Sequence, residues 1–135
     1  MGKKFLKKII AQSAKDLQII SACCSEAKVK IADIKYLSSN KIFLISLLRI
    51  DKENENSEKK INSIVKFEFV QSTKSKNINQ VDSKLLLELI GINIFKKGHN
   101  FEIVFLFSEN RLITLTTEAI EATLEDQKFI NDKNT

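Results

Sequence analysis

Hydrophobic and polar residues alternate along much of this chain, as they do in β-strands. In residues 101–107 every second position is aromatic or aliphatic, and most of the positions between them are apolar as well. A polar turn at 108–111 leads into 112–117, where aliphatic residues alternate with threonines. The two stretches predict a hairpin whose first strand is apolar on both faces. The rest of the chain must therefore cover both sides of the sheet.

The same alternation predicts further strands. They are expected at residues 5–11, 28–37, 42–50, 61–71, 90–95 and 119–125. The stretch 42–50 is apolar on both faces and is predicted to be central, whereas 5–11 carries a lysine pair and is expected at a sheet edge. Residues 84–89 are compatible with a single helical turn, and periodicity alone leaves this open.

One helix is predicted, at Ala14–Glu26. Ser13 is a typical N-cap residue, and Asp16 follows it at the spacing of a capping box. Apolar residues from Leu17 to Cys24 recur at helical spacing and form one stripe. This stripe is expected to cover one face of the sheet.

These elements predict an α+β fold: a curved antiparallel sheet or half-open barrel of six to seven strands, with the one N-terminal helix packed on it. A pleckstrin-homology-like barrel is the named alternative, although the helix that caps that fold is usually C-terminal. The predicted core consists of Leu17, Ile20, Cys24, Leu44, Phe67, Phe69, Ile103, Phe105 and Leu115.

The length of 135 residues indicates a single domain spanning 1–135. Polar composition predicts flexible tails at 1–4 and 127–135, and a mobile loop at 51–60. A second polar loop is expected at 72–80.

The net charge is +5, and most of it comes from lysines within the first eight residues. The candidate basic contact surface consists of Lys3, Lys4, Lys7, Lys8, Lys74 and Lys76. Since the remainder of the chain is nearly neutral, and lysines commonly protect edge strands from aggregation, the charge is weak support for nucleic-acid or anionic-surface binding. Such binding stays an alternative.

The candidate acidic surface consists of Glu118, Glu121, Glu125 and Asp126. It is interpreted as a solvated face rather than an acid–base pair. If the strands at 5–11 and 119–125 are neighbours, these acids are expected to neutralise the N-terminal lysines.

Little in the sequence indicates catalysis. His99 is the only histidine and has no carboxylate or cysteine at metal-ligand spacing. Cys23 and Cys24 fall in the apolar part of the predicted helix, where thiols act as small hydrophobes, which disfavours a cysteine–histidine dyad. Phosphate-binding loops, nucleophile motifs and zinc spacings are absent from the sequence. We therefore expect no catalytic, cofactor-binding or metal-binding residue, and a protein that is not an enzyme.

The expected compartment is the cytoplasm. Two adjacent cysteines provide no disulfide framework, and Lys7 and Lys8 interrupt any apolar core of a signal peptide. The longest apolar runs are too short or too interrupted by polar residues to predict a membrane span.

Several short segments resemble those of a known family. They are Lys8–Gln12 (KIIAQ), Asp16–Ala22 (DLQIISA), Val29–Ile31 (VKI), Asp33–Leu37 (DIKYL) and Ile120–Asp126 (IEATLED). In this order they resemble an uncharacterised domain-of-unknown-function family of small alphaproteobacterial proteins. After Arg49 the family pattern has aromatic residues including a tryptophan, where this chain has Ile50–Lys52 (IDK). The resemblance implies a cytoplasmic housekeeping setting and supplies no catalytic residue.

Three functions follow as hypotheses. The first is a non-enzymatic protein-interaction or accessory module whose partner is another protein, because residues for packing are abundant and residues for chemistry are few. The alternatives are a weak nucleic-acid or anionic-surface binder that uses the N-terminal lysines, and a small-ligand-binding barrel.

Overall fold

The computed structural model describes residues 6–51 and 59–130. The elements are β1 (Lys8–Ala11), α1 (Ala14–Cys24), β2 (Lys28–Lys30), the 3-10 helix η1 (Ile31–Asp33), β3 (Ile34–Leu37), β4 (Ile42–Ile50), β5 (Lys60–Phe67), β6 (Val70–Lys76), β7 (Leu86–Lys97), β8 (Asn100–Phe107), β9 (Arg111–Thr117) and β10 (Ala122–Ile130). The α+β class and the antiparallel sheet are confirmed. The predicted number of six to seven strands was wrong, because the described residues form ten.

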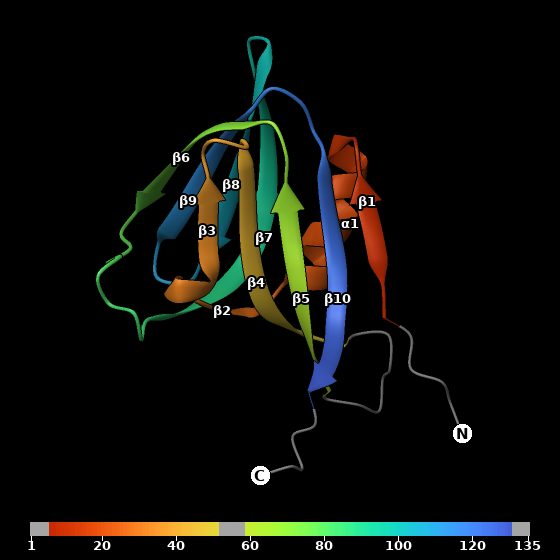
Figure 1. The fold of residues 1–135 in the computed structure, drawn as a ribbon, viewed down its shortest axis with the longest axis vertical. Helices are drawn as coiled ribbons and strands as arrows, with labels where there is room; N and C mark the ends of the chain where they lie inside the picture. Colours follow the sequence, from red (N-terminus) through yellow and green to blue (C-terminus); the bar gives the residue numbers. More distant parts are fainter. Residues whose placement is uncertain (1–5, 52–58, 131–135) are drawn as a thin grey trace.

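The strands follow the order β1-β10-β5-β4-β2-β7-β8-β9-β6, and β3 also pairs with β4. The sheet folds over into two halves, with β1, β10, β5, β4 and β3 in one and β7, β8, β9 and β6 in the other (Figure 1). The short strand β2 pairs with both β4 and β7 and joins the halves. At the opposite corner, β5 leads into β6 and β9 leads into β10. The sheet does not close into a barrel.

The corner between β5 and β6 was not predicted. The expected strand at 61–71 ends at Phe67, and the expected loop at 72–80 is largely the strand β6. The residues of β6 are polar because the strand lies at the end of the sheet and is mostly exposed, and pairing with β9 overrides their low strand preference. Polarity alone therefore indicated a loop where an edge strand forms.

Other boundaries also differ from the sequence prediction. The strand β7 begins at Leu86, so the helical turn considered for 84–89 was wrong. The 3-10 helix η1 interrupts the strand predicted at 28–37, and β10 continues into the segment 127–130 that was predicted as tail. That extension pairs with the start of β5. The tails and the loop predicted for residues 1–4, 131–135 and 52–58 lie outside the described residues.

The core lies between the two halves of the sheet and is centred on Phe105 of β8. The ring of Phe105 packs against Phe43 of β4 and Phe67 of β5, with ring centroids 5.6 and 5.5 Å apart. Both partners come from the other half, so these contacts hold the halves together. Of the predicted core, seven residues are buried: Leu17, Ile20, Cys24, Phe67, Ile103, Phe105 and Leu115.

Two predicted core residues were wrong. Leu44 points to the outer face, because β4 buries only alternate residues from Phe43 onward and is not covered on both sides. Phe69 lies at the corner before β6 and is 46% exposed. Its φ of 61° is in the left-handed region, which is unfavourable for a bulky side chain.

The predicted helix is confirmed, and it covers one seam of the folded sheet. The Ser13 hydroxyl accepts a hydrogen bond from the Asp16 amide at 3.1 Å, as expected for an N-cap. The helix packs against β7 and β1 (Figure 1), and the Ser21 hydroxyl accepts a hydrogen bond from the Ile92 amide of β7 at 2.9 Å. At this position a side chain of the helix α1 accepts a hydrogen bond from the backbone of β7, as a neighbouring strand would.

The backbone strain at Phe69 gives a prediction about glycine. We expect F69G to be more stable than F69A by about 1 kcal/mol, because only alanine keeps a Cβ in the left-handed region. Urea unfolding of both variants measures the difference. As a matched control, S75G in the regular part of β6 should be less stable than S75A by about 0.5–1 kcal/mol. If the glycine variant were less stable than the alanine variant at both positions, the backbone at Phe69 would not be strained.

Candidate functional site

A groove lies at the seam of the folded sheet that α1 does not cover. Within the described part of the chain, β3 pairs only with β4 and β6 pairs only with β9, so each strand has one unpaired edge. The groove between them has a volume of about 490 Å³. The two strands lie on the same side of the molecule, away from the helix (Figure 1).

The walls of the groove are strand edges rather than strand faces. Three consecutive residues from each strand line it, namely Ile34, Lys35 and Tyr36 from β3 and Thr73, Lys74 and Ser75 from β6. Successive side chains of a strand point to opposite faces. Three neighbours can therefore line one groove only along the edge, where backbone N–H and C=O groups are available for pairing.

The floor of the groove is apolar. Phe43 of β4 and Ile113 of β9 line it, and both belong to the buried core. Ile31 and Ile78 add partly buried apolar surface near one end. A side chain that entered the groove would therefore reach the interior between the two halves of the sheet.

One end of the groove is held closed by hydrogen bonds. The Tyr36 hydroxyl donates to the carbonyl of Val70 at 2.8 Å, and the Val70 amide donates to the carbonyl of Lys41 at 2.8 Å. Tyr36 is near the end of β3 and Val70 begins β6, while Ile34 lines the groove with Thr73 further along. The two strands therefore run in opposite directions, as their arrows show in Figure 1.

The charged residues of the groove are both lysines. Lys35 and Lys74 line it, and both are exposed. Neither forms an ion pair with any other described residue. The groove thus combines unpaired backbone edges, an apolar floor and uncompensated positive charge.

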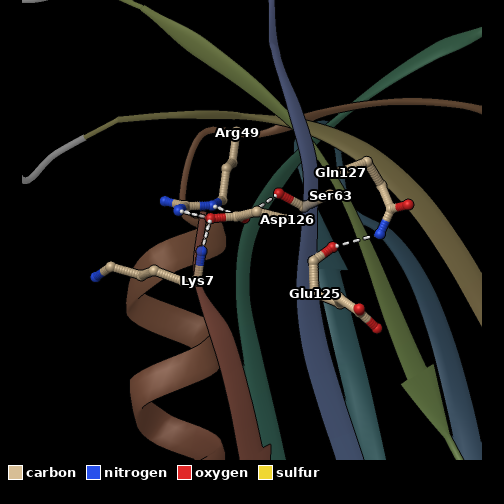
Figure 2. A network of polar contacts seen from close by, with 6 residues as sticks. All are labelled: Lys7, Arg49, Ser63, Glu125, Asp126 and Gln127. Carbon is tan, nitrogen blue, oxygen red and sulfur yellow. Dashed lines mark hydrogen bonds and ion pairs between the residues drawn. The ribbon is translucent and has the colours of Figure 1, made fainter. Parts of the chain in front are cut away.

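A buried ion pair supports the other half of the sheet. Arg49 of β4 and Asp126 of β10 are both buried, and two bonds join them: Nε to Oδ1 at 3.0 Å and Nη2 to Oδ2 at 2.8 Å. The Ser63 hydroxyl of β5 donates to Oδ1 at 2.6 Å, and the Lys7 amide donates to Oδ2 at 2.8 Å. Figure 2 shows the Asp126 carboxylate between these donors. Four chain segments meet at one carboxylate.

This network fixes the charge of Asp126. Burial by itself raises the pKa of the carboxyl, but the hydrogen bonds from Arg49, Ser63 and the Lys7 amide together hold that pKa below its ordinary value. Glu125 and Gln127 lie apart from these donors and are exposed, and the Gln127 side chain donates to the Glu125 carbonyl at 3.1 Å (Figure 2). We interpret the network as a structural tie, because its carboxylate is turned away from solvent.

Arg49 was not among the predicted site residues, and the predicted position of Asp126 was wrong. The assignment of Asp126 to an exposed acidic surface was wrong, since the residue is 6% exposed. The available signal was the period of β4, in which Phe43, Ile45 and Leu47 point inward and Arg49 is the next inward position. A cation at an inward position indicates a buried acidic partner.

The other predicted acidic residues lie near the surface. The exposed Glu118 pairs with Lys41 at 3.0 Å, and hydrogen bonds from Lys41 and Gln71 lower its pKa. Glu121 accepts from the Gln12 side chain at 3.1 Å, and Lys8 lies opposite Glu125 in the pairing of β1 with β10. The condition for charge neutralisation, that these two strands are neighbours, is therefore met.

The structure does not bring the described basic candidates together. Lys7 and Lys8 are at β1, whereas Lys74 and Lys76 are on β6, at the other end of the strand order (Figure 1). Lys3 and Lys4 lie outside the described residues. A continuous basic face from these lysines is therefore not formed by the described residues.

The cysteine–histidine pair considered from the sequence is not assembled. Cys24 is fully buried in the core, and Cys23 beside it is partly buried. His99 is exposed in the two-residue turn between β7 and β8, next to Gly98 at φ 63°. Residues 6–51 and 59–130 contain no cluster of three histidine, cysteine or acidic side chains that could hold a metal ion. The described helices include none long and apolar enough to cross a membrane.

A protein-family model described as "Protein of unknown function (DUF2948)" matches residues 7–133. Because the match covers nearly the whole chain, the chain belongs to this family. The expected membership of an uncharacterised domain family is thereby confirmed. Comparison with curated proteins and with solved structures gives no match.

The buried ion pair gives a prediction about stability. We expect R49M and D126N each to lower the free energy of unfolding by about 3–5 kcal/mol, because each breaks the buried, doubly hydrogen-bonded pair of Arg49 and Asp126 from one side. The double variant should lose much less than the sum of the two. In the exposed pair Lys97–Glu102, the matched variants K97M and E102Q should show a coupling energy below about 1 kcal/mol. Additive losses at Arg49 and Asp126 would contradict the account.

The lowered pKa of Asp126 gives a prediction about pH. A lowered pKa stabilises the folded state above the ordinary Asp pKa of about 3.9, and this contribution is lost as the pH falls through that value toward the folded-state pKa. S63A should cost about 1.5–3 kcal/mol at pH 7 and progressively less in acid.

Urea unfolding from pH 7 to pH 3 measures this trend. The control is S46A, which removes an uncharged hydrogen bond to Asn62 and should cost the same at every pH. A pH-independent cost for S63A would contradict the prediction.

Proposed function

We propose that this protein is a non-enzymatic interaction module that binds an extended segment of a partner protein between β3 and β6. The observation that carries the proposal is the groove whose two walls are unpaired strand edges. Such edges bind peptides by adding a strand, with main-chain hydrogen bonds giving affinity and side-chain pockets giving specificity.

The rest of the groove suits this role. The floor formed by Phe43 and Ile113 offers apolar contact to side chains of the bound segment. The strand β6 has seven residues, a length comparable to that of an ordinary strand. Long unpaired edges promote aggregation unless they are protected, and a partner segment would satisfy the same backbone groups.

A small-ligand function is the second candidate, because a volume of about 490 Å³ is within the range of small-molecule sites. The polar side chains of the groove are spread over both walls, and each wall is a strand with one unpaired edge. This favours a polypeptide. Nucleic-acid binding is less favoured, since the described basic candidates lie at opposite ends of the sheet.

The proposal includes a cytoplasmic setting in an alphaproteobacterium. Its supports are the sequence resemblance and the two free cysteines, which suit a reducing compartment. The proposed partner is a housekeeping protein of the same compartment.

The test is selection of random nine-residue peptides on phage against the purified chain. Amide hydrogen exchange is then measured with and without the selected peptides. We expect slower exchange at β3 and β6, because their exposed amides become paired in the complex. The matched control is β1, the strand at the other end of the sheet, whose exchange should not change. Failure to select any peptide, or protection confined to other elements, would overturn the proposed function.

A further inference from the structure

We infer that the segment bound in the groove is acidic, runs antiparallel to β6, and alternates apolar with acidic side chains. This inference rests on the proposed function and specifies its partner. It is supported by the directions of the two walls, the side chains on the two faces of β6, and the lysines of the groove.

The directions of the walls limit how a strand can pair. Because β3 and β6 run in opposite directions, one added strand can be antiparallel to only one of them. Antiparallel pairing is slightly more stable per residue than parallel pairing. The strand β6 has seven residues and β3 has four, so β6 offers the longer antiparallel partner. The N-terminus of the segment would then lie near Lys76, and its C-terminus would point toward the closed end of the groove, where Val70 is already hydrogen bonded to Tyr36 and Lys41.

The inner face of β6 favours apolar side chains. Thr73 and Ser75 lie opposite Leu115 and Ile113 of β9, which are both buried, so they are on the inner face of the sheet. Thr73 is partly buried and Ser75 is exposed there, at the open groove. Residues of the added strand next to Thr73 and Ser75 would point the same way, over the apolar floor. Small residues at these positions leave room for larger apolar side chains from the partner.

The outer face favours acidic side chains. Lys74 and Lys76 lie opposite Thr114 and Leu112, on the other face of β6 from the buried pair. Lys35 of β3 lies opposite Leu44, which is also on the outer face. Residues of the added strand that point outward would therefore lie beside lysines from both walls. Opposite charges are the favourable cross-strand partners at such positions.

The same lysines argue against a second copy of this chain as the occupant. If two β6 strands paired antiparallel about Ser75, Lys74 of each would face Lys76 of the other. Like charges directly opposite one another destabilise a strand pair. In that register the lysines disfavour a second copy, whereas an acidic strand is favoured beside them.

The test uses three synthetic nine-residue peptides on the full chain. The first alternates valine with glutamate, the second alternates valine with lysine, and the third has the composition of the first but no alternation. Fluorescence anisotropy measures their affinities for the wild type, for K74E/K76E, and for the control K8E on the opposite edge strand.

We expect the valine–glutamate peptide to bind at least about tenfold more tightly than the other two. Its glutamates can pair with the exposed lysines, and its alternation places all of them on the outer face. K74E/K76E should reverse the preference in favour of the valine–lysine peptide, and K8E should change no affinity by more than about twofold. High salt should weaken the preferred complex. Equal affinity for the three peptides, or an unchanged preference in K74E/K76E, would overturn the inference.

The direction of the segment is tested separately. A spin label at the N-terminus of the bound peptide should broaden the amide signal of Lys76, and broadening at Val70 would overturn the antiparallel assignment. These outcomes are distinguishable from failure of the proposed function. If phage selection yields peptides that protect β3 and β6 but are not acidic, the interaction module stands and only the partner chemistry is wrong.

Discussion

The constraint on which this structure depends is that every strand edge needs hydrogen-bonding partners. A sheet folded into two halves without closing has two seams, and the two are treated differently here. At one seam α1 covers β7 and β1, and the Ser21 hydroxyl takes the place of a neighbouring strand for the Ile92 amide. At the other seam β3 and β6 approach at one end only, through Tyr36 and Val70. The resulting groove is a consequence of how the sheet folds, and it leaves backbone groups available.

The frame around the groove is held by interactions of two kinds. The aromatic contacts of Phe105 join the two halves of the sheet through the core. The Asp126 carboxylate joins β4, β5 and β10 to the residue that precedes β1. The Asp126 network lies away from the groove, whereas Phe43, which contacts Phe105, forms part of the groove floor. A preformed groove of this kind lowers the ordering cost of binding.

The periodicity of apolar residues along the chain predicted most of the secondary structure, because helices and strands each have a characteristic repeat. The helix cap at Ser13 and the strand β4 were recovered from the residues themselves. The strand β6 was missed because its polar residues resemble a loop and only pairing with β9 makes it a strand. The groove and the partner of Arg49 depend on which distant strands become neighbours. No local pattern specifies that, so Lys74, which was predicted as part of a general basic surface, proves to be a groove residue.

The measurement that tests the central account most directly is an NMR structure of the chain with a selected peptide bound. The account predicts cross-strand contacts between the peptide backbone and β6, with an apolar peptide side chain against Phe43 and Ile113. A peptide bound elsewhere, or bound in the groove without backbone pairing to β6, would contradict it.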